Sequence, residues 1–98
     1  MPNIPLAHRK IINEDPKYRV CARRGEDGCA GRITIEEACL YAGKQIKELW
    51  NYVPLCEFHH GVGNYANCYG QNKRRHREIA MAQATDADKK KYPRLPWS

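Results

Sequence analysis

Two short stretches in the middle of the chain have the residue pattern of β-strands. The β-branched residues of the Ile-Thr-Ile stretch favour a strand that ends at Glu36 or Glu37. The stretch Trp-Asn-Tyr-Val predicts a second strand, with Asn51 on one of its two faces. Between them, apolar residues recur at helical spacing, but Gly43 weakens a helix there by about 1 kcal/mol relative to alanine. The pattern therefore predicts a strand followed by a partly helical connection.

Helical patterns follow the second predicted strand. The stretch Cys-Glu-Phe-His-His predicts about one helical turn that ends before Gly61. Residues 71–84 are mostly good helix formers and predict the clearest helix of the chain. Thr85 and Asp88 have the spacing of a capping box, so we expect a last short helix through the lysines that follow.

The length of the chain and its proline distribution define the expected domain organisation. Three of the six prolines fall within residues 1–19, so we expect an extended N-terminal arm there. Residues 20–98 are enough for one small domain, with helices added at its C-terminal end. With 29% charged residues the apolar core is thin, and domains of this size often need a disulfide or a metal ion to be stable.

The chain has a net charge of +6. This charge points to a polyanionic partner, of which nucleic acid is the first candidate, or to a basic surface that serves only solubility. A dense basic cluster lies in the predicted helix over residues 71–84. We expect its members to contact DNA phosphates without reading bases, unless they form an ordinary solvated helix face. They are Lys73, Arg74, Arg75 and Arg77.

The cysteines predict a metal site. No apolar run resembles a signal peptide or a membrane span, so we expect a cytoplasmic protein with reduced thiols and no membrane partner. Five cysteines cannot all pair, and metal ligation is the natural use of several of them. Tetrahedral zinc is commonly bound by two close ligand pairs, for which Cys56 with His59 and Cys21 with Cys29 are the candidates. The alternative is a small core of reduced side chains.

His60, which directly follows His59, extends this pattern. Asn51, Leu55, Cys56, His59 and His60 together resemble the zinc-bearing half-motif of the HNH nucleases, in which His59 replaces a second cysteine. The resemblance covers roughly residues 20–62 and implies a ββα-metal domain of the type found in phages or mobile elements.

The resemblance also implies roles for individual residues. Glu36 and His60 would hold a divalent ion, Mg²⁺ or Mn²⁺, at the scissile phosphate, and Asn51 would orient the general base. The position of that base, normally histidine, is occupied by Glu37. A carboxylate with a pKa near about 4.3 is a weaker base than imidazole and brings negative charge toward a phosphate. Glu37 has the alternative role of capping the segment that begins at Thr34, and His60 and Asn51 have structural alternatives as well.

These observations lead to one expected fold and three competing functions. The fold is an α+β, zinc-bound ββα-metal domain with an added C-terminal helix. The first function is DNA binding with metal-dependent hydrolysis weak or lost through Glu37. The second is a decayed nuclease reused as a protein-binding inhibitor, for instance an anti-CRISPR or another counter-defence factor that acts on a host defence protein or ribonucleoprotein in the host cytoplasm. The third is an active nicking endonuclease.

Overall fold

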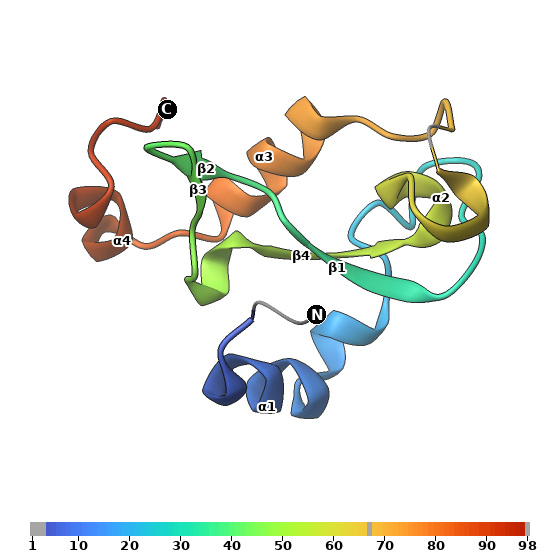
Figure 1. Cartoon of the computed structure of the whole chain (residues 1–98), viewed down its shortest axis with the longest axis horizontal. Coiled ribbons are helices and arrows are strands. Elements are labelled where there is room, and N and C mark those ends of the chain that lie inside the picture. Colours follow the sequence, from blue (N-terminus) through green and yellow to red (C-terminus); the bar gives the residue numbers. More distant parts are fainter. Residues whose placement is uncertain (1–3, 67, 98) are drawn as a thin grey trace.

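The computed structural model describes residues 4–66 and 68–97, and it has an α+β architecture built on two short antiparallel sheets. Strands β1 (Ile33–Glu37) and β4 (Tyr52–Cys56) form the central pair. In Figure 1, helix α1 (Leu6–Glu14) lies on one side of this pair and α3 (Lys73–Ala82) on the other. The short helix α2 (Glu57–His60) continues directly from β4 at one end of the molecule.

The central pair explains where the core lies. Its register pairs Ile33 with Cys56 and Glu37 with Tyr52, and all five residues of β4 are buried. On one face of β4, Val53 and Leu55 pack toward α3. On the other face, Tyr52 belongs to a cluster with Ile4, Ile12 and Tyr18. A strand covered on both faces reads as a continuous apolar run, as β4 does.

The connection between the central strands is a β-hairpin, so the predicted partly helical connection is wrong. Strands β2 (Leu40–Tyr41) and β3 (Lys44–Gln45) pair across a two-residue turn, followed by the 3₁₀ turn η2 (Leu49–Asn51). The turn residues Ala42 and Gly43 both have positive φ, 53° and 80°. That geometry suits a hairpin of type I′, for which glycine at the second position is favourable. Asn51 consequently lies in η2 and not on the second strand, contrary to the sequence-based expectation.

The N-terminal segment is helical, which corrects the prediction of an extended arm. Pro5 stands at the N-cap of α1, and Pro16 begins the 3₁₀ turn η1 (Pro16–Arg19). At these positions proline costs no intrahelical hydrogen bond, so the prolines bracket the helix and do not prevent it. The helix is stabilised by burying Ile12 beside Tyr52 and Ile35.

The C-terminal helices agree with the sequence pattern. Helix α3 spans Lys73–Ala82, and α4 spans Asp86–Lys91 with both hydrogen bonds of the Thr85–Asp88 capping box. α2 ends at Gly61, whose φ of 78° is left-handed and favours glycine. Within the described residues, none of the helices has the length and apolarity that a membrane crossing requires.

Candidate metal centre and adjacent cavity

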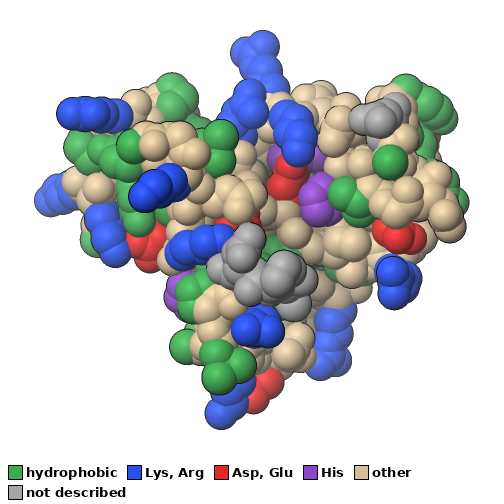
Figure 2. Space-filling model, viewed as in Figure 1, with side chains coloured by type: hydrophobic (Ala, Val, Ile, Leu, Met, Phe, Trp, Pro, Cys, Tyr) green, Lys and Arg blue, Asp and Glu red, His purple; other side chains and the backbone are tan. Residues whose placement is uncertain are grey.

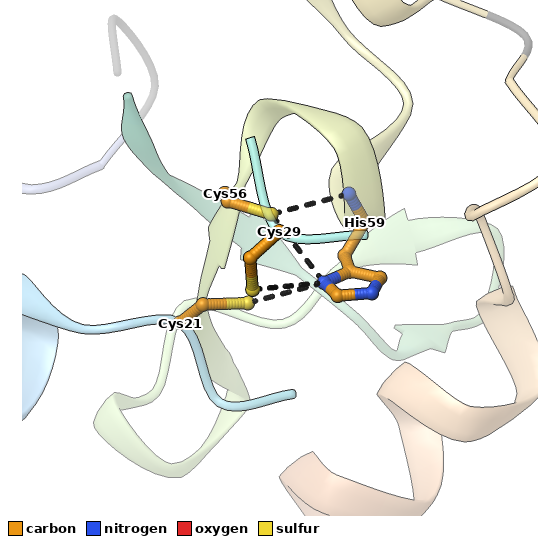
Figure 3. A group of neighbouring side chains, drawn as sticks. All are labelled: Cys21, Cys29, Cys56 and His59. Atoms are coloured by element: carbon orange, nitrogen blue, oxygen red, sulfur yellow. Dashed lines mark hydrogen bonds between the residues drawn. The ribbon is translucent and has the colours of Figure 1, made fainter. Parts of the chain in front are cut away.

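Four side chains from three segments converge at the end of β4 (Figure 3). Cys21 follows η1, Cys29 ends the loop that starts there, and Cys56 and His59 come from the end of β4 and from α2. Their ligand atoms all lie within 4.8 Å of one another. The structure thus brings together the four residues predicted as metal ligands, and we call them the Cys/His cluster.

The dimensions of the Cys/His cluster fit a tetrahedral ion. The Nδ1 atom of His59 lies 3.4–3.5 Å from the Sγ atoms of the three cysteines. A tetrahedral zinc with Zn–S of about 2.3 Å and Zn–N of about 2.0–2.1 Å separates sulfur from nitrogen by about 3.5 Å. The cluster could therefore hold a metal such as zinc without rearrangement of the ring.

The outer nitrogen of His59 fixes the tautomer that a metal requires. Nε2 lies 3.1 Å from the backbone oxygen of Asp27, which can only accept a hydrogen bond. Nε2 must then carry the proton, and the Nδ1 lone pair points at the three sulfurs (Figure 3). A hydrogen bond of this kind to the second nitrogen is typical of metal-bound histidine.

The thiols of the Cys/His cluster differ in acidity. Burial, together with the neighbouring sulfurs of Cys56 and Cys21, raises the pKa of the Cys29 thiol to about 12. Burial also raises the pKa of Cys56, but backbone N–H donation from His59 and Ala30 outweighs it and leaves that pKa below its usual value. Three sulfurs this close favour a bound cation, because metal ligation replaces their protons with positive charge.

A cavity of about 660 Å³ lies along β1 and next to α2. Its lining includes Glu36, Glu37, His60 and Lys73, together with residues of α1 and η1. Figure 2 shows acidic and histidine side chains grouped near the middle of the visible face, with lysine and arginine side chains beside them. Three of the residues to which the family resemblance assigned chemistry therefore share one cavity.

Both oxygens of Glu36 are engaged by other side chains. Lys73 Nζ donates to Oε1 at 3.0 Å, and His76 Nδ1 lies 2.5 Å from Oε2. Burial raises the pKa of this carboxyl, but the contacts with His76 and Lys73 outweigh burial and hold the pKa below its usual value. Glu36 is thus an ionised carboxylate, and a divalent ion would have to compete with the ammonium group for it.

Among the described residues, one ring nitrogen of His60 has a hydrogen-bond partner and the other has none. The Thr34 hydroxyl donates to the Leu55 carbonyl at 2.9 Å, so it accepts from Nδ1 of His60, 2.6 Å away. The neutral ring then keeps its lone pair on Nε2. Burial lowers the pKa of His60 and outweighs the negative charge of Glu36, which raises it, while the positive charge of Lys73 adds to the lowering. A neutral imidazole with a free lone pair can bind a metal ion or accept a proton.

Glu37 and Asn51 are not placed as a general base and the residue that orients it would be. Lys47 Nζ lies 2.5 Å from Oε2 of Glu37, whose side chain is nearly buried. The amide of Asn51 accepts from the Cys39 N–H at 2.7 Å and donates to the carbonyls of Cys39 and Ile46 at 3.1 and 3.0 Å. Asn51 therefore binds the backbone that follows Glu37, and its side-chain hydrogen bonds in the structure go to that backbone and not to Glu37 or His60.

The predicted DNA-binding residues do not share one face of α3. Lys73 lines the cavity beside Glu36, and Arg75 lies 3.6 Å from a carboxylate oxygen of Glu26. Arg74 and Arg77 line a second cavity of about 410 Å³ on another side of the helix. Only part of the basic cluster is therefore directed at the cavity that contains Glu36 and His60.

Two residues that the sequence pattern groups with the surface charges are buried. His76 is fully buried, and Arg23 is 8% exposed, although both lie in basic stretches that read as surface. For His76, the signal available in the sequence is its position four residues before the apolar Ala80, on the same face of a helical stretch.

Comparison of the chain with protein-family models, with curated proteins and with solved structures found no match.

Proposed function

We propose that the chain is an HNH-type DNA-binding protein, stabilised by zinc at the Cys/His cluster, in which metal-dependent phosphodiester hydrolysis is weak or lost. The observation that carries the proposal is the cavity in which Glu36, Glu37 and His60 meet beside the Cys/His cluster. Two antiparallel strands followed at once by a helix that bears His60 are the order of elements that a ββα-metal domain requires.

The partners of the two glutamates support weak hydrolysis. Lys73 and His76 hold Glu36, and Lys47 lies against Glu37. A carboxylate in contact with an ammonium group is a poorer base and a poorer metal ligand, because its charge is already compensated. Hydrolysis of a phosphodiester needs both an activated water and a cation at the phosphate. In the proposed site, Lys47 and Lys73 would thus compete with a catalytic cation for the two carboxylates.

Salt-dependent binding tests the DNA component. Each phosphate contact contributes a slope of about −0.9 to the dependence of log affinity on log salt. Replacing the four basic residues of α3 with alanine should therefore reduce the slope by up to about 3–4 if every one contacts a phosphate. A control that removes four charges elsewhere should leave most of the slope in place, for which the exposed Lys10, Lys17, Lys44 and Lys90 are suitable.

A plasmid-nicking assay with Mg²⁺ and with Mn²⁺ tests the hydrolytic component. We expect nicking to be faint or absent, since general-base catalysis typically contributes about 10²–10⁴-fold. Rapid nicking by the wild type would instead identify an active endonuclease. Absence of DNA binding even at low salt would reject the proposal as a whole.

The second cavity favours one further candidate, a protein-binding inhibitor. Its lining combines the apolar Leu40, Met81 and Leu95 with Arg74 and Arg77, and Leu40 is 56% exposed. Apolar surface beside arginine is typical of protein interfaces. Failure to bind DNA together with saturable binding to a nuclease ribonucleoprotein would support this candidate over the first.

A further inference from the structure

A buried chain of polar groups connects the loop between Cys21 and Cys29 to the cavity. Arg23, in that loop, donates through Nη1 to the Gly70 carbonyl at 2.7 Å, and the same nitrogen lies 3.1 Å from Nε2 of His76. His76 in turn contacts Glu36, as described above, so the chain ends at the carboxylate that Lys73 also holds. We call Arg23, His76 and Glu36 the buried relay.

The chemistry of the buried relay fixes the state of its central ring. A guanidinium can only donate, so Nε2 of His76 accepts from Arg23. Nδ1 is left to carry the ring proton, and it lies in close contact with the carboxylate of Glu36. The hydrogen bond at Nε2 of this fully buried histidine therefore reports whether Arg23 is in place.

The position of Arg23 depends on the segment that holds the metal ligands. The loop over residues 22–28 contains turns but no helix or strand, and ligands of the Cys/His cluster stand at both of its ends. Ordering the backbone of a loop costs roughly 1–2 kcal/mol per residue. A metal ion that binds both ends offsets much of this cost, while the remaining support includes the contacts of Arg23 with Gly70 and Glu26.

We propose that Arg23 and His76 are positioning residues through which metal binding at the Cys/His cluster fixes Glu36 and Lys73 in the cavity. The coupling is energetic and must act in both directions. Metal binding favours the arrangement of the buried relay, and an intact relay raises the affinity of the cluster for its metal. Helix α3 is therefore held in place by the metal-bound loop, since it carries both His76 and Lys73.

The first test measures the tautomer of His76 in metal-loaded protein by ¹H–¹⁵N correlation of the imidazole nitrogens. Wild type should show the Nδ1–H form, in which Nε2 accepts from Arg23. Arg23→Met should shift the ¹⁵N resonance of Nε2, because that nitrogen loses its donor while the carboxylate of Glu36 keeps the proton on Nδ1. The control is Arg24→Met, which removes the same charge from the adjacent, exposed position. Arg24 hydrogen-bonds the backbone of Cys21, which makes it a strict control for proximity to the metal. An unchanged Nε2 resonance of His76 in Arg23→Met would overturn the proposal.

The second test measures metal affinity by competition with a chromophoric zinc chelator. Arg23→Met should weaken zinc binding by a factor typical of coupled sites, roughly 5- to 150-fold, and Arg24→Met should not. His76→Asn should weaken it as well, and the double variant should be no weaker than the worse single variant, because both act through one relay. Additive losses, or equal affinities for Arg23→Met and Arg24→Met, would refute the coupling. If Arg23→Met does not fold, Arg23→Lys keeps a charged donor and should give intermediate values in both tests.

A last readout concerns DNA and rests on the proposed function. Arg23→Met should lose DNA affinity in the same proportion as Lys73→Ala, because it releases the helix that presents Lys73. If the wild type does not bind DNA, the proposed function fails, while the imidazole ¹⁵N and zinc measurements still decide the coupling.

Discussion

Replacing Asn51 with alanine should destabilise the fold more than any other single truncation of an asparagine. The side chain is completely buried, and its three hydrogen bonds go to backbone groups of Cys39 and Ile46. In Asn51→Ala the Cys39 carbonyl keeps its bond from the Ile46 N–H at 3.3 Å. The Cys39 N–H and the Ile46 carbonyl lose their Asn51 partner, and each unsatisfied buried group costs about 1–3 kcal/mol. The expected loss in free energy of unfolding is therefore about 2–6 kcal/mol.

Urea denaturation of metal-loaded protein, followed by circular dichroism, measures this loss. Asn64→Ala is the matched control, because Asn64 is exposed and its truncation should change stability by less than about 0.5 kcal/mol. Asn51→Asp separates the two functions of the amide, since it keeps the acceptor for the Cys39 N–H and replaces the donor with a group that repels both carbonyls. It should be at least as destabilising as alanine. A loss below about 1 kcal/mol in Asn51→Ala would refute the structural role and return Asn51 to the catalytic one implied by the family resemblance.

Three further predictions follow from the site. Elemental analysis should find one zinc per chain, and chelation should unfold the protein, because binding free energy in such sites is largely folding free energy; a cooperatively folded, zinc-free chain would contradict this. Glu36 has a folded-state pKa below its unfolded value, so its contribution to stability is present above pH of about 4.3 and is lost as the pH falls through the folded pKa; acid titration of Glu36→Gln should show a shallower loss of stability than wild type. Glu37→His restores a near-neutral base and should raise Mn²⁺-dependent nicking, and adding His60→Ala should abolish the gain; no nicking in Glu37→His would mean that the base is not the only missing element.

The local features of the fold could be read from the sequence. Helix α3, the capping box of α4 and the end of α2 at Gly61 depend on residues within one or two helical turns of each other. The Cys56–His59 pair is local as well, because a single turn at the start of α2 brings the two side chains together. Five cysteines in a small domain then made a metal site the natural hypothesis for Cys21 and Cys29, and the structure places all four ligands together.

The contacts that decide the chemistry of the cavity were not local. Arg23 and His76 are separated by 53 positions, and the buried relay they form with Glu36 has no counterpart in any sequence pattern. The helix at the N-terminus exists because Ile12 packs on Tyr52 and Ile35, and the hairpin is fixed by Asn51 across 12 positions. Residue type alone determined which side chains were able to bind a metal ion or a phosphate. Whether Glu36 is free to do so depends on Lys73 and His76, and only the packing of α3 against the central strands brings these two side chains to it. The physical reason is that a charged group can be buried only where the fold supplies a partner for it.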